Sequence, residues 1–194
     1  VAMVLAGQTD VVDKIRAGED LYCDFASKMF GRTITKADKK ERLLGKIAML
    51  SLQYGEGLRK FKEMVRQQSG EIIADTSAEN TVNLYRSVRR KVVDMWDRLN
   101  NVVLPEIAAG CPNLLAIDGN AWLICTGEGF GVHANPGVVY HNLRKVSRVD
   151  DYGRPQQDWV YDMGRETPKL YGGKIFENAC QHVARQIVMW QTAR

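Results

Sequence analysis

The part of this sequence best suited to bind a ligand is a set of four residues at intervals of four: Arg42, Lys46, Leu50 and Tyr54. Each step of four residues turns an α-helix by about 400°, so on a helix these side chains form one slowly drifting stripe. The two cations come first, near the N-terminal end of the expected helix, where the backbone makes positive charge unfavourable. A phosphate-bearing ligand reverses that balance, because Arg grips phosphate oxygens with a fork of donors and Lys adds a mobile point charge.

The same spacing is also compatible with a solvated basic helix face on which Leu50 and Tyr54 are half buried. Gly45, next to Lys46, lowers intrinsic helix stability but leaves room for close approach. The spacing alone therefore leaves two interpretations, a phosphate-binding stripe and an ordinary surface.

The element that must position the stripe is predicted from the residues around it. Thr35 followed by Asp38 resembles a capping box, and the helix it opens should run over about 36–54, before Gly55. Apolar spacing predicts further helices in the first half of the chain, over residues 1–5, 11–17, 19–30 and 58–68.

The longest periodic stretch runs from Ala78 to Leu104 and predicts one long helix with a single buried face. It carries four clustered cations, Arg86, Arg89, Arg90 and Lys91. We interpret this basic cluster either as a solvated face or as a salt-dependent contact with nucleic-acid phosphates.

The pattern changes after Pro112. Short apolar runs predict strands over 121–126 and 138–140, and a last helix is expected over 174–190. Glycine-rich turns are predicted at 110–112, 127–131 and 150–153. The resulting fold class is α+β and mainly helical, with a helical lobe over about 11–95 and a mixed portion from residue 96 onward.

Composition limits the classes of function. The 194 residues are 45% hydrophobic and 26% charged, with a net charge of +4 and a pI of about 8.9, which permits a nucleic-acid partner without requiring one. The four cysteines show no C-x-x-C spacing, which argues against a zinc site and favours a reducing cytoplasm. The apolar segment Val1–Gly7 is too short to span a bilayer, so no membrane partner is expected. A nucleotide-binding ATPase is disfavoured because no G-x-x-x-x-G-K-[ST] motif occurs.

The segment from Arg42 to Gly55 resembles motif B of the family A DNA polymerases, the DNA polymerase I type. That motif reads R-x-x-x-K-x-x-x-F-x-x-x-Y-G on the fingers helix that closes over the incoming nucleotide, and four of its five anchored positions match here. Residues 18–31 are similar to the stretch that precedes motif B in bacteriophage enzymes, and residues 171–185 to the helix before their last catalytic motif. Residues 140–144, Tyr-His-Asn-Leu-Arg, weakly resemble a Y-P-N-L-R segment between them, whereas 119–136 match nothing in the family pattern.

The resemblance implies template-directed DNA synthesis, which adds deoxynucleotides to a primer 3′ end during phage DNA replication in the host cytoplasm. Residues 1–10 would then end a palm helix, 11–95 would form the fingers subdomain, and 96–194 the remainder of the fingers and part of the palm. The implied partners are primer–template DNA, deoxynucleoside triphosphates and, as a further option, a host or phage processivity factor.

Carried over by position, the resemblance assigns the nucleotide to five residues, Arg42, Lys46, Leu50, Tyr54 and Tyr22. Arg42 and Lys46 would bind the triphosphate, and Lys46 would also act in catalysis as a proton donor to the leaving pyrophosphate. Leu50 would lie against the sugar and base, although the family has an aromatic residue there. Tyr22 stands where many cellular relatives have His, so its phosphate contact is at most that of a hydroxyl.

The resemblance assigns contacts with DNA to four residues. Tyr54 would stack where the templating base enters, and Gly55 would let the backbone turn. Gln181 would donate to the minor groove of the primer–template, where hydrogen-bond acceptors are shared by all correct pairs. Arg144, in the weakly matching segment, would also contact DNA.

The family performs nucleotidyl transfer with two Mg²⁺ ions held by paired carboxylates. The first carboxylate belongs to a D-x-S-x-I-E-x-R motif, and Val1–Gly7 resembles the segment directly after that motif. The second belongs to an H-D-E motif expected after Arg194. We therefore expect an internal fragment with substrate-binding residues and no metal ligand. The alternative is a non-enzymatic helical nucleic-acid-binding module, which does not need Tyr54-Gly55 at the end of the stripe.

Overall fold

The computed structural model describes residues 1–109, 113–117, 120–126, 129–132, 135–149 and 153–192. It divides into two compact units, one over Ala2–Asp94 and one over Met95–Arg194 together with Val1. The fold is α+β and mainly helical, as predicted. The identification of these parts as fingers and palm stays a prediction.

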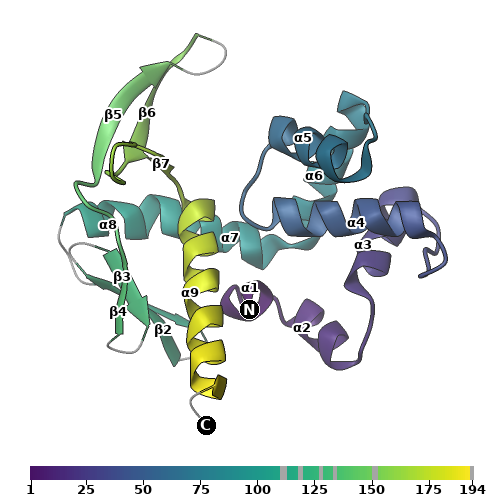
Figure 1. Ribbon diagram of the computed structural model, residues 1–194, viewed down its shortest axis with the longest axis horizontal. Coiled ribbons are helices and arrows are strands. Elements are labelled where there is room, and N and C mark those ends of the chain that lie inside the picture. The colour runs from purple at the N-terminus through teal and green to yellow at the C-terminus, as the bar shows by residue number, and fades with distance from the viewer. Residues whose placement is uncertain (110–112, 118–119, 127–128, 133–134, 150–152, 193–194) are drawn as a thin grey trace. The chain divides into compact units, whose positions relative to one another are not determined.

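The first unit is built from helices, drawn in purple to teal in Figure 1. Their bounds are α1 Ala2–Leu5, α2 Thr9–Arg16, α3 Leu21–Phe30, α4 Lys39–Leu52, α5 Leu58–Ser69 and α6 Asp75–Val88, followed by the first part of α7, Arg90–Arg98. The helix that carries the stripe is α4, which lies inside the predicted range 36–54.

The start of α4 departs from the expected capping box. The Asp38 carboxylate accepts hydrogen bonds from the Thr35 backbone N–H (2.8 Å) and hydroxyl (3.0 Å), but neither side chain caps a backbone N–H of the helix. Arg32 lies 3.0 Å from Asp38 and 2.6 Å from Glu41. The Thr35 N–H and the Arg32 guanidinium lower the pKa of Asp38 to about 2. This ionised carboxylate fixes the chain just ahead of the helix, which begins at Lys39.

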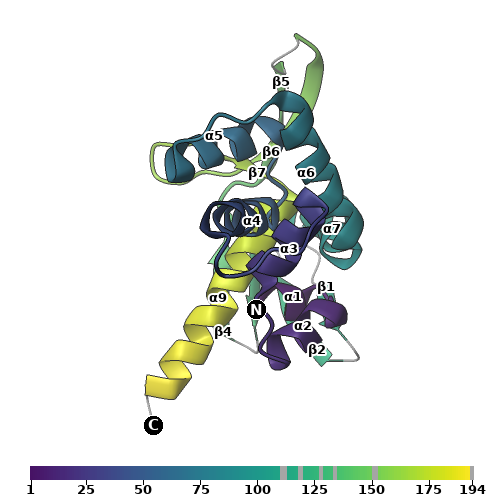
Figure 2. The ribbon, with the colours of Figure 1, turned by 90° about the vertical axis from the view of Figure 1, so that its right-hand side faces the viewer.

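Gly45 allows α3 to pack closely against α4, and the two helices lie side by side in Figure 2. A Cβ atom at this position would be 2.5 Å from the Tyr22 carbonyl oxygen and 2.9 Å from Ala26 Cβ. Gly45 is therefore required by helix packing, whereas the sequence indicated only that a glycine here leaves room for the close approach of a ligand. The core beside this contact includes Phe25 and Tyr85, whose rings meet edge to face at 5.8 Å.

The single long helix predicted over 78–104 is wrong. Helix α6 ends at Val88, and Arg89 leaves the helical conformation with φ −122° and ψ 46°. Helix α7 follows, then a π-helix over Leu99–Val103 and α8 over Leu104–Ala108. The periodic pattern persists because buried residues continue at intervals of seven on both sides of the break, at Tyr85, Val92 and Leu99.

The second unit combines strands with a long C-terminal helix. A four-stranded antiparallel sheet has the order β1-β2-β3-β4, with β1 Asn113–Ile117, β2 Asn120–Thr126, β3 Gly129–Val132 and β4 Asn135–Val139. The strand predicted at 121–126 lies within β2, and the one predicted at 138–140 overlaps β4. Part of the turn predicted at 127–131 is instead strand β3, and residues 127–128 lie outside the described residues. So do the turn predicted at 110–112 and residues 150–152 of the turn predicted at 150–153.

A second antiparallel sheet was not predicted. It consists of β5 Arg144–Val149, β6 Pro155–Val160 and β7 Lys169–Leu170, and β5 and β6 form a twisted ribbon in Figure 1. Most side chains of β5 are exposed, on both faces of the strand: Lys145, Ser147, Arg148 and Val149. The sequence therefore lacks the alternation of buried and polar residues that marks a half-buried strand.

Helix α9, Gly172–Thr192, includes the helix predicted over 174–190. Its first residue, Gly172, lies against α7, because a Cβ atom added there would be 2.0 Å from the Trp96 carbonyl oxygen. Asn100, in the π-helix, accepts a 3.4 Å hydrogen bond from the Gly172 N–H. This close approach fixes where α9 begins.

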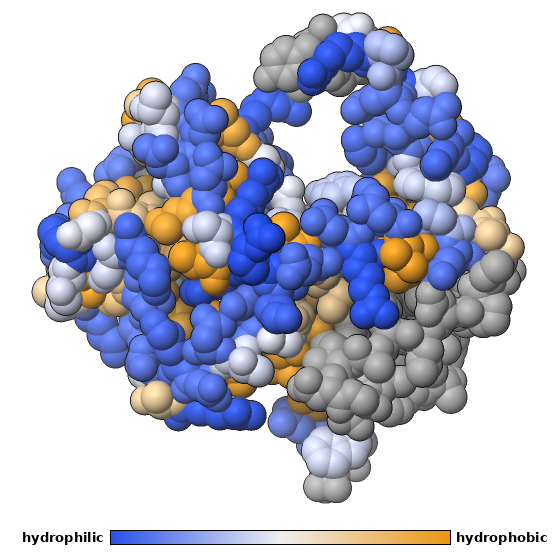
Figure 3. Space-filling view, turned by 180° about the vertical axis from the view of Figure 1, so that it is seen from behind, coloured by the Kyte–Doolittle hydropathy of each residue, from blue (hydrophilic) through white to orange (hydrophobic). Residues whose placement is uncertain are grey.

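The face of the molecule seen in Figure 3 is mostly hydrophilic, with apolar side chains in separate patches. Exposed apolar residues include Leu50 on α4 and the segment Ile187–Trp190 near the end of α9. Among the residues that the structure describes, no helix combines the length and the apolar content needed to cross a membrane.

Candidate functional site

Two of the four residues of the predicted stripe, Lys46 and Leu50, are exposed, whereas Arg42 and Tyr54 are half buried. From Gly45 to Leu52, every side chain is buried except Lys46 and Leu50. Leu50 is 44% exposed, which is more than the half-buried position expected for an ordinary surface. A single exposed leucine is common in proteins, so the inference rests on the stripe as a whole. A cation and an apolar side chain one turn apart are thus the exposed positions in the otherwise buried second half of the helix.

Arg42 stands one turn into α4 and is held in place by α3. Its Nε and Nη2 atoms both lie 2.8 Å from Oδ2 of Asp20, to which they donate. The guanidinium carbon lies 5.4 Å from the centre of the Tyr22 ring, in cation–π contact. The structure thus brings together Arg42 and Tyr22, two residues assigned to the nucleotide by resemblance.

Asp20 caps α3 as well as binding Arg42. Its Oδ1 accepts hydrogen bonds from the backbone N–H groups of Tyr22 (3.0 Å) and Cys23 (3.1 Å). Burial of this carboxyl opposes its ionisation, but the hydrogen bonds from Arg42 and Cys23 outweigh burial and lower the pKa of Asp20. The same pairing raises the pKa of Arg42. Sequence reasoning missed Asp20; an Asp at a helix start was visible, but its partner lies 22 residues away.

Tyr54 and Gly55 come directly after the last turn of α4. Tyr54 is half buried, and Gly55 adopts a φ of 79°, a left-handed conformation that glycine reaches without strain. The chain therefore turns at Gly55 as the resemblance implies. The contact of either residue with DNA stays a prediction.

Arg89 does not belong to the predicted exposed basic cluster, because it is buried. Its side chain is only 2% exposed, and its guanidinium lies 3.9 Å from carboxylate oxygens of both Asp10 and Asp24. It also lies 3.9 Å from the sulfur of Met49 on α4, and its Nε atom has no hydrogen-bond partner in the described part of the chain. The other three cations of the cluster are exposed. Arg89 faces inward because the break between α6 and α7 turns it toward the two acidic groups.

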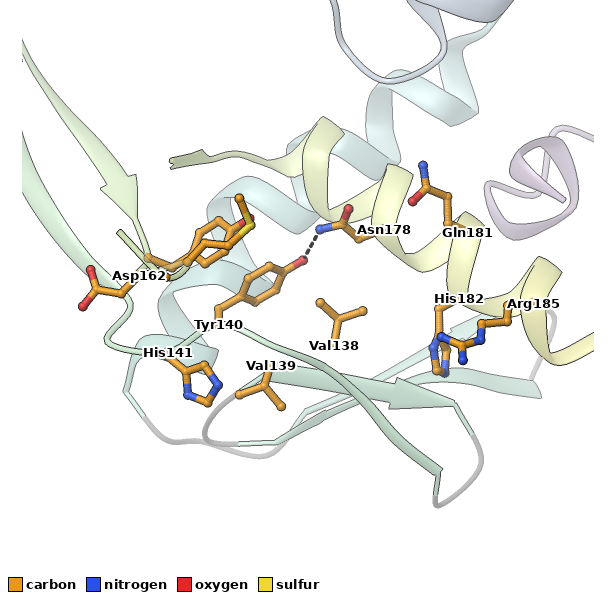
Figure 4. Close-up of a pocket in the computed structure, with 12 residues that line it drawn as sticks. Val138, Val139, Tyr140, His141, Asp162, Asn178, Gln181, His182 and Arg185 are labelled. Atoms are coloured by element: carbon orange, nitrogen blue, oxygen red, sulfur yellow. Dashed lines mark hydrogen bonds between the residues drawn. The ribbon is translucent and has the colours of Figure 1, made fainter. Parts of the chain in front are cut away.

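The second unit contains a separate pocket of about 590 Å³ beside α9 (Figure 4). Helix α9 contributes residues at helical spacing on one face, Asn178, Gln181, His182 and Arg185. Asn178 donates a 2.9 Å hydrogen bond to the hydroxyl of Tyr140, shown dashed in Figure 4. Burial raises the pKa of Tyr140 far above its usual value, so this hydroxyl stays neutral. Gln181 was predicted as a DNA contact; the three residues that share its face were not, although their spacing was visible.

Gln181 and Arg144 already have partners within this unit. Gln181 Nε2 lies 3.1 Å from Glu177 Oε1, an exposed contact that solvent competes for. Arg144 donates from Nη1 to Asp162 Oδ1 and to the Asn142 carbonyl, at 2.8 and 2.9 Å. The Asp162 carboxylate offsets part of the charge of Arg144, and the contact of Arg144 with DNA stays a prediction.

Within the described residues, no group of three or more His, Cys, Asp or Glu side chains is arranged to hold a metal ion. The described part of the chain therefore offers no fit for the Mg²⁺ ions implied by the resemblance. The location of their ligands outside this chain stays a prediction.

Comparison with known proteins returned no match, either to a protein-family model or to a curated protein. The functional assignment therefore rests on the residues of the stripe and on their geometry.

Proposed function

We propose that this chain binds the incoming deoxynucleoside triphosphate and the primer–template in template-directed DNA synthesis, as part of a bacteriophage-type family A DNA polymerase. The observation that carries the proposal is the stripe along α4. Its Lys46 and Leu50 are exposed and its Arg42 is half buried, and the stripe ends at the turn made by Tyr54 and Gly55.

The order of residues along the stripe matches the order of the parts of a nucleotide, from the triphosphate to the sugar and base. Four residues of helix advance by about 6 Å, so Arg42 and Lys46 are spaced to meet different parts of a triphosphate. The guanidinium of Arg42 offers a fork of donors to phosphate oxygens, and Lys46 is exposed and can move with the ligand. Lys46 would also donate a proton toward the leaving pyrophosphate. Leu50 comes next and offers an apolar contact to the sugar and base.

The residues of α9 supply the second part of the proposed function. Gln181 lies on an exposed face of α9 beside Asn178 and Arg185, at the pocket in Figure 4. Amide groups can donate to the minor-groove acceptors present in every correct base pair, which suits an enzyme that copies any sequence. The cation of Arg185 would add a contact with the phosphate backbone.

The test of this function is the equilibrium binding of a labelled deoxynucleoside triphosphate to the purified 194-residue chain. We expect saturable binding that is competed by the other three deoxynucleoside triphosphates and by inorganic triphosphate, and much less by the nucleoside. All four should compete because the stripe contacts the phosphates and the sugar, which they share. Binding of duplex DNA without any nucleotide binding would instead identify a non-enzymatic nucleic-acid-binding module.

Leu50 is expected to take part in selecting the sugar. In a polymerase that carries this chain together with its catalytic carboxylates, Leu50→Tyr should raise the acceptance of dideoxynucleotides relative to deoxynucleotides. The new hydroxyl would fill the space left by a missing 3′-hydroxyl, and one hydrogen bond corresponds to a change of about two- to tenfold.

The measurement for Leu50 is the ratio of dideoxynucleotide to deoxynucleotide incorporation in single-nucleotide extension. Leu50→Phe is the matched control, because it adds the ring without the hydroxyl. If Leu50→Tyr and Leu50→Phe give the ratio of the unchanged protein, Leu50 does not lie against the sugar.

A further inference from the structure

Asp20 uses its two oxygens for two different tasks. Oδ1 accepts from the backbone at the start of α3, and Oδ2 accepts from Arg42 on α4. We propose that Asp20 is a positioning residue, which holds the Arg42 guanidinium in the orientation that receives the triphosphate. This inference rests on the proposed nucleotide site and assigns it a residue outside the stripe.

The geometry of the ion pair leaves Arg42 able to bind a second anion. Asp20 occupies one edge of the planar guanidinium, the edge formed by Nε and Nη2. The Nη1 hydrogens and the second Nη2 hydrogen point away from that edge, because the five donors of the group are fixed in one plane. Phosphate oxygens can therefore accept hydrogen bonds from the outer end of Arg42 while the pair with Asp20 stays intact.

Asp20 is itself unable to move with the ligand. Its Oδ1 is bonded to the backbone N–H groups of Tyr22 and Cys23, and α3 lies so close to α4 that only glycine fits at position 45. The Tyr22 ring lies against the guanidinium of Arg42 at 5.4 Å. Arg42 is thus constrained from two directions by groups that belong to one rigid helix start. A preset Arg42 loses less side-chain freedom when a nucleotide binds.

A positioning role and a purely electrostatic role of Asp20 predict opposite changes in triphosphate affinity when Asp20 is removed. The direction of the change therefore tests the proposal. Removing a carboxylate makes the site more positive and should tighten the binding of a triphosphate if Asp20 contributes only its charge. Removing a positioning residue should weaken binding despite the gain in positive charge. We expect weakening because the negative charge of Asp20 is already offset by two 2.8 Å contacts with Arg42.

The experiment uses Asp20→Asn and Asp20→Ser in the 194-residue chain, because Asn and Ser keep an acceptor for the α3 backbone while removing the carboxylate. The dissociation constant of a deoxynucleoside triphosphate is measured at equilibrium, and helix content is measured by circular dichroism. Both variants should bind about two- to tenfold more weakly, which corresponds to the cost of ordering one rotamer-rich side chain on binding. Unchanged or tighter binding in both variants overturns the positioning role.

A second comparison separates positioning from general damage to the fold. In an Arg42→Ala background, Asp20→Asn should cause no further weakening, because Asp20 acts through Arg42. If it weakens binding equally there, Asp20 acts on the fold and the proposal is wrong. Asp13→Asn is the matched control, since Asp13 pairs with an exposed arginine, Arg16, on α2, outside the stripe and its helix; its effect should be small.

The results also distinguish this inference from the proposed function on which it rests. If Arg42→Ala weakens nucleotide binding and Asp20→Asn does not, only the positioning role fails. If Arg42→Ala leaves nucleotide binding unchanged, or the unaltered chain binds no nucleotide, both proposals fail.

Discussion

Replacing Arg42 or Lys46 with alanine is expected to weaken deoxynucleotide binding by one to two decades, while primer–template binding changes much less. A hydrogen bond to a charged group contributes about 1.5–3 kcal/mol, which corresponds to a factor of roughly 10–150 in affinity. The selective loss is expected because the two cations lie one turn apart on α4, with Lys46 exposed and Arg42 half buried. The measurements are equilibrium dissociation constants for a deoxynucleoside triphosphate and for a primer–template duplex, at the same salt concentration.

Two further variants sharpen this test. Arg42→Lys keeps the positive charge but loses the fork of donors, so it should fall between the unchanged protein and Arg42→Ala. Lys40→Ala is the matched control, because Lys40 is an exposed cation on the same helix but lies off the stripe. Arg42→Ala leaves Asp20 without its partner, so helix content must be compared as well. Equal losses of nucleotide and DNA affinity would count against the assignment of these cations to the triphosphate.

The 194-residue chain by itself is expected not to extend a primer at any Mg²⁺ concentration, although we propose that it binds nucleotide. Neither D-x-S-x-I-E-x-R nor H-D-E occurs in this sequence. Without metal-binding carboxylates, the primer hydroxyl stays protonated near neutral pH. The charge that develops on the phosphate then has Arg42 and Lys46 as its partners, and positioning alone does not replace the missing activation of the hydroxyl.

Two acidic residues near the N-terminus, Asp20 and Asp24, are poor substitutes because each is paired with cations. Asp20 is bound to Arg42, and Asp24 accepts from both Lys14 and Lys28. Other candidate carboxylates, Asp118, Asp150 and Asp151, lie outside the described residues.

The assay is template-directed primer extension by the chain, beside a protein that contains the chain and both carboxylate motifs. A mock purification controls for host polymerases. Extension by the 194-residue chain that is absent from the mock sample would show that its catalytic carboxylates lie within this sequence.

Much of the helical unit could be predicted from the sequence because its signals are local. The spacing of apolar residues and the glycines at helix ends located α2, α3, α4 and α5 to within a few residues. The same reasoning failed at Arg89, because a buried face that repeats every seven residues continues across a break in the helix. It also missed the β5–β6 ribbon, where exposed side chains on both faces leave no alternation to detect.

The residues that form the stripe could be read from the sequence alone, since a helix places residues at intervals of four on one face wherever it forms. The turn at Gly55 could be read in the same way, because few other residues adopt that conformation. These properties depend on near neighbours along the chain, and local geometry is enough to derive them.

The packing of the helices could not be derived in this way. It leaves Lys46 and Leu50 exposed on α4, and it places Arg42 against Asp20 at the start of another helix. It also buries Arg89, one of four clustered cations, close to Asp10 and Asp24. Burial and ion pairing depend on which surfaces pack together. Asp20 and Arg42, 22 positions apart, meet because two helices share a core, and spacing along the chain does not encode that meeting.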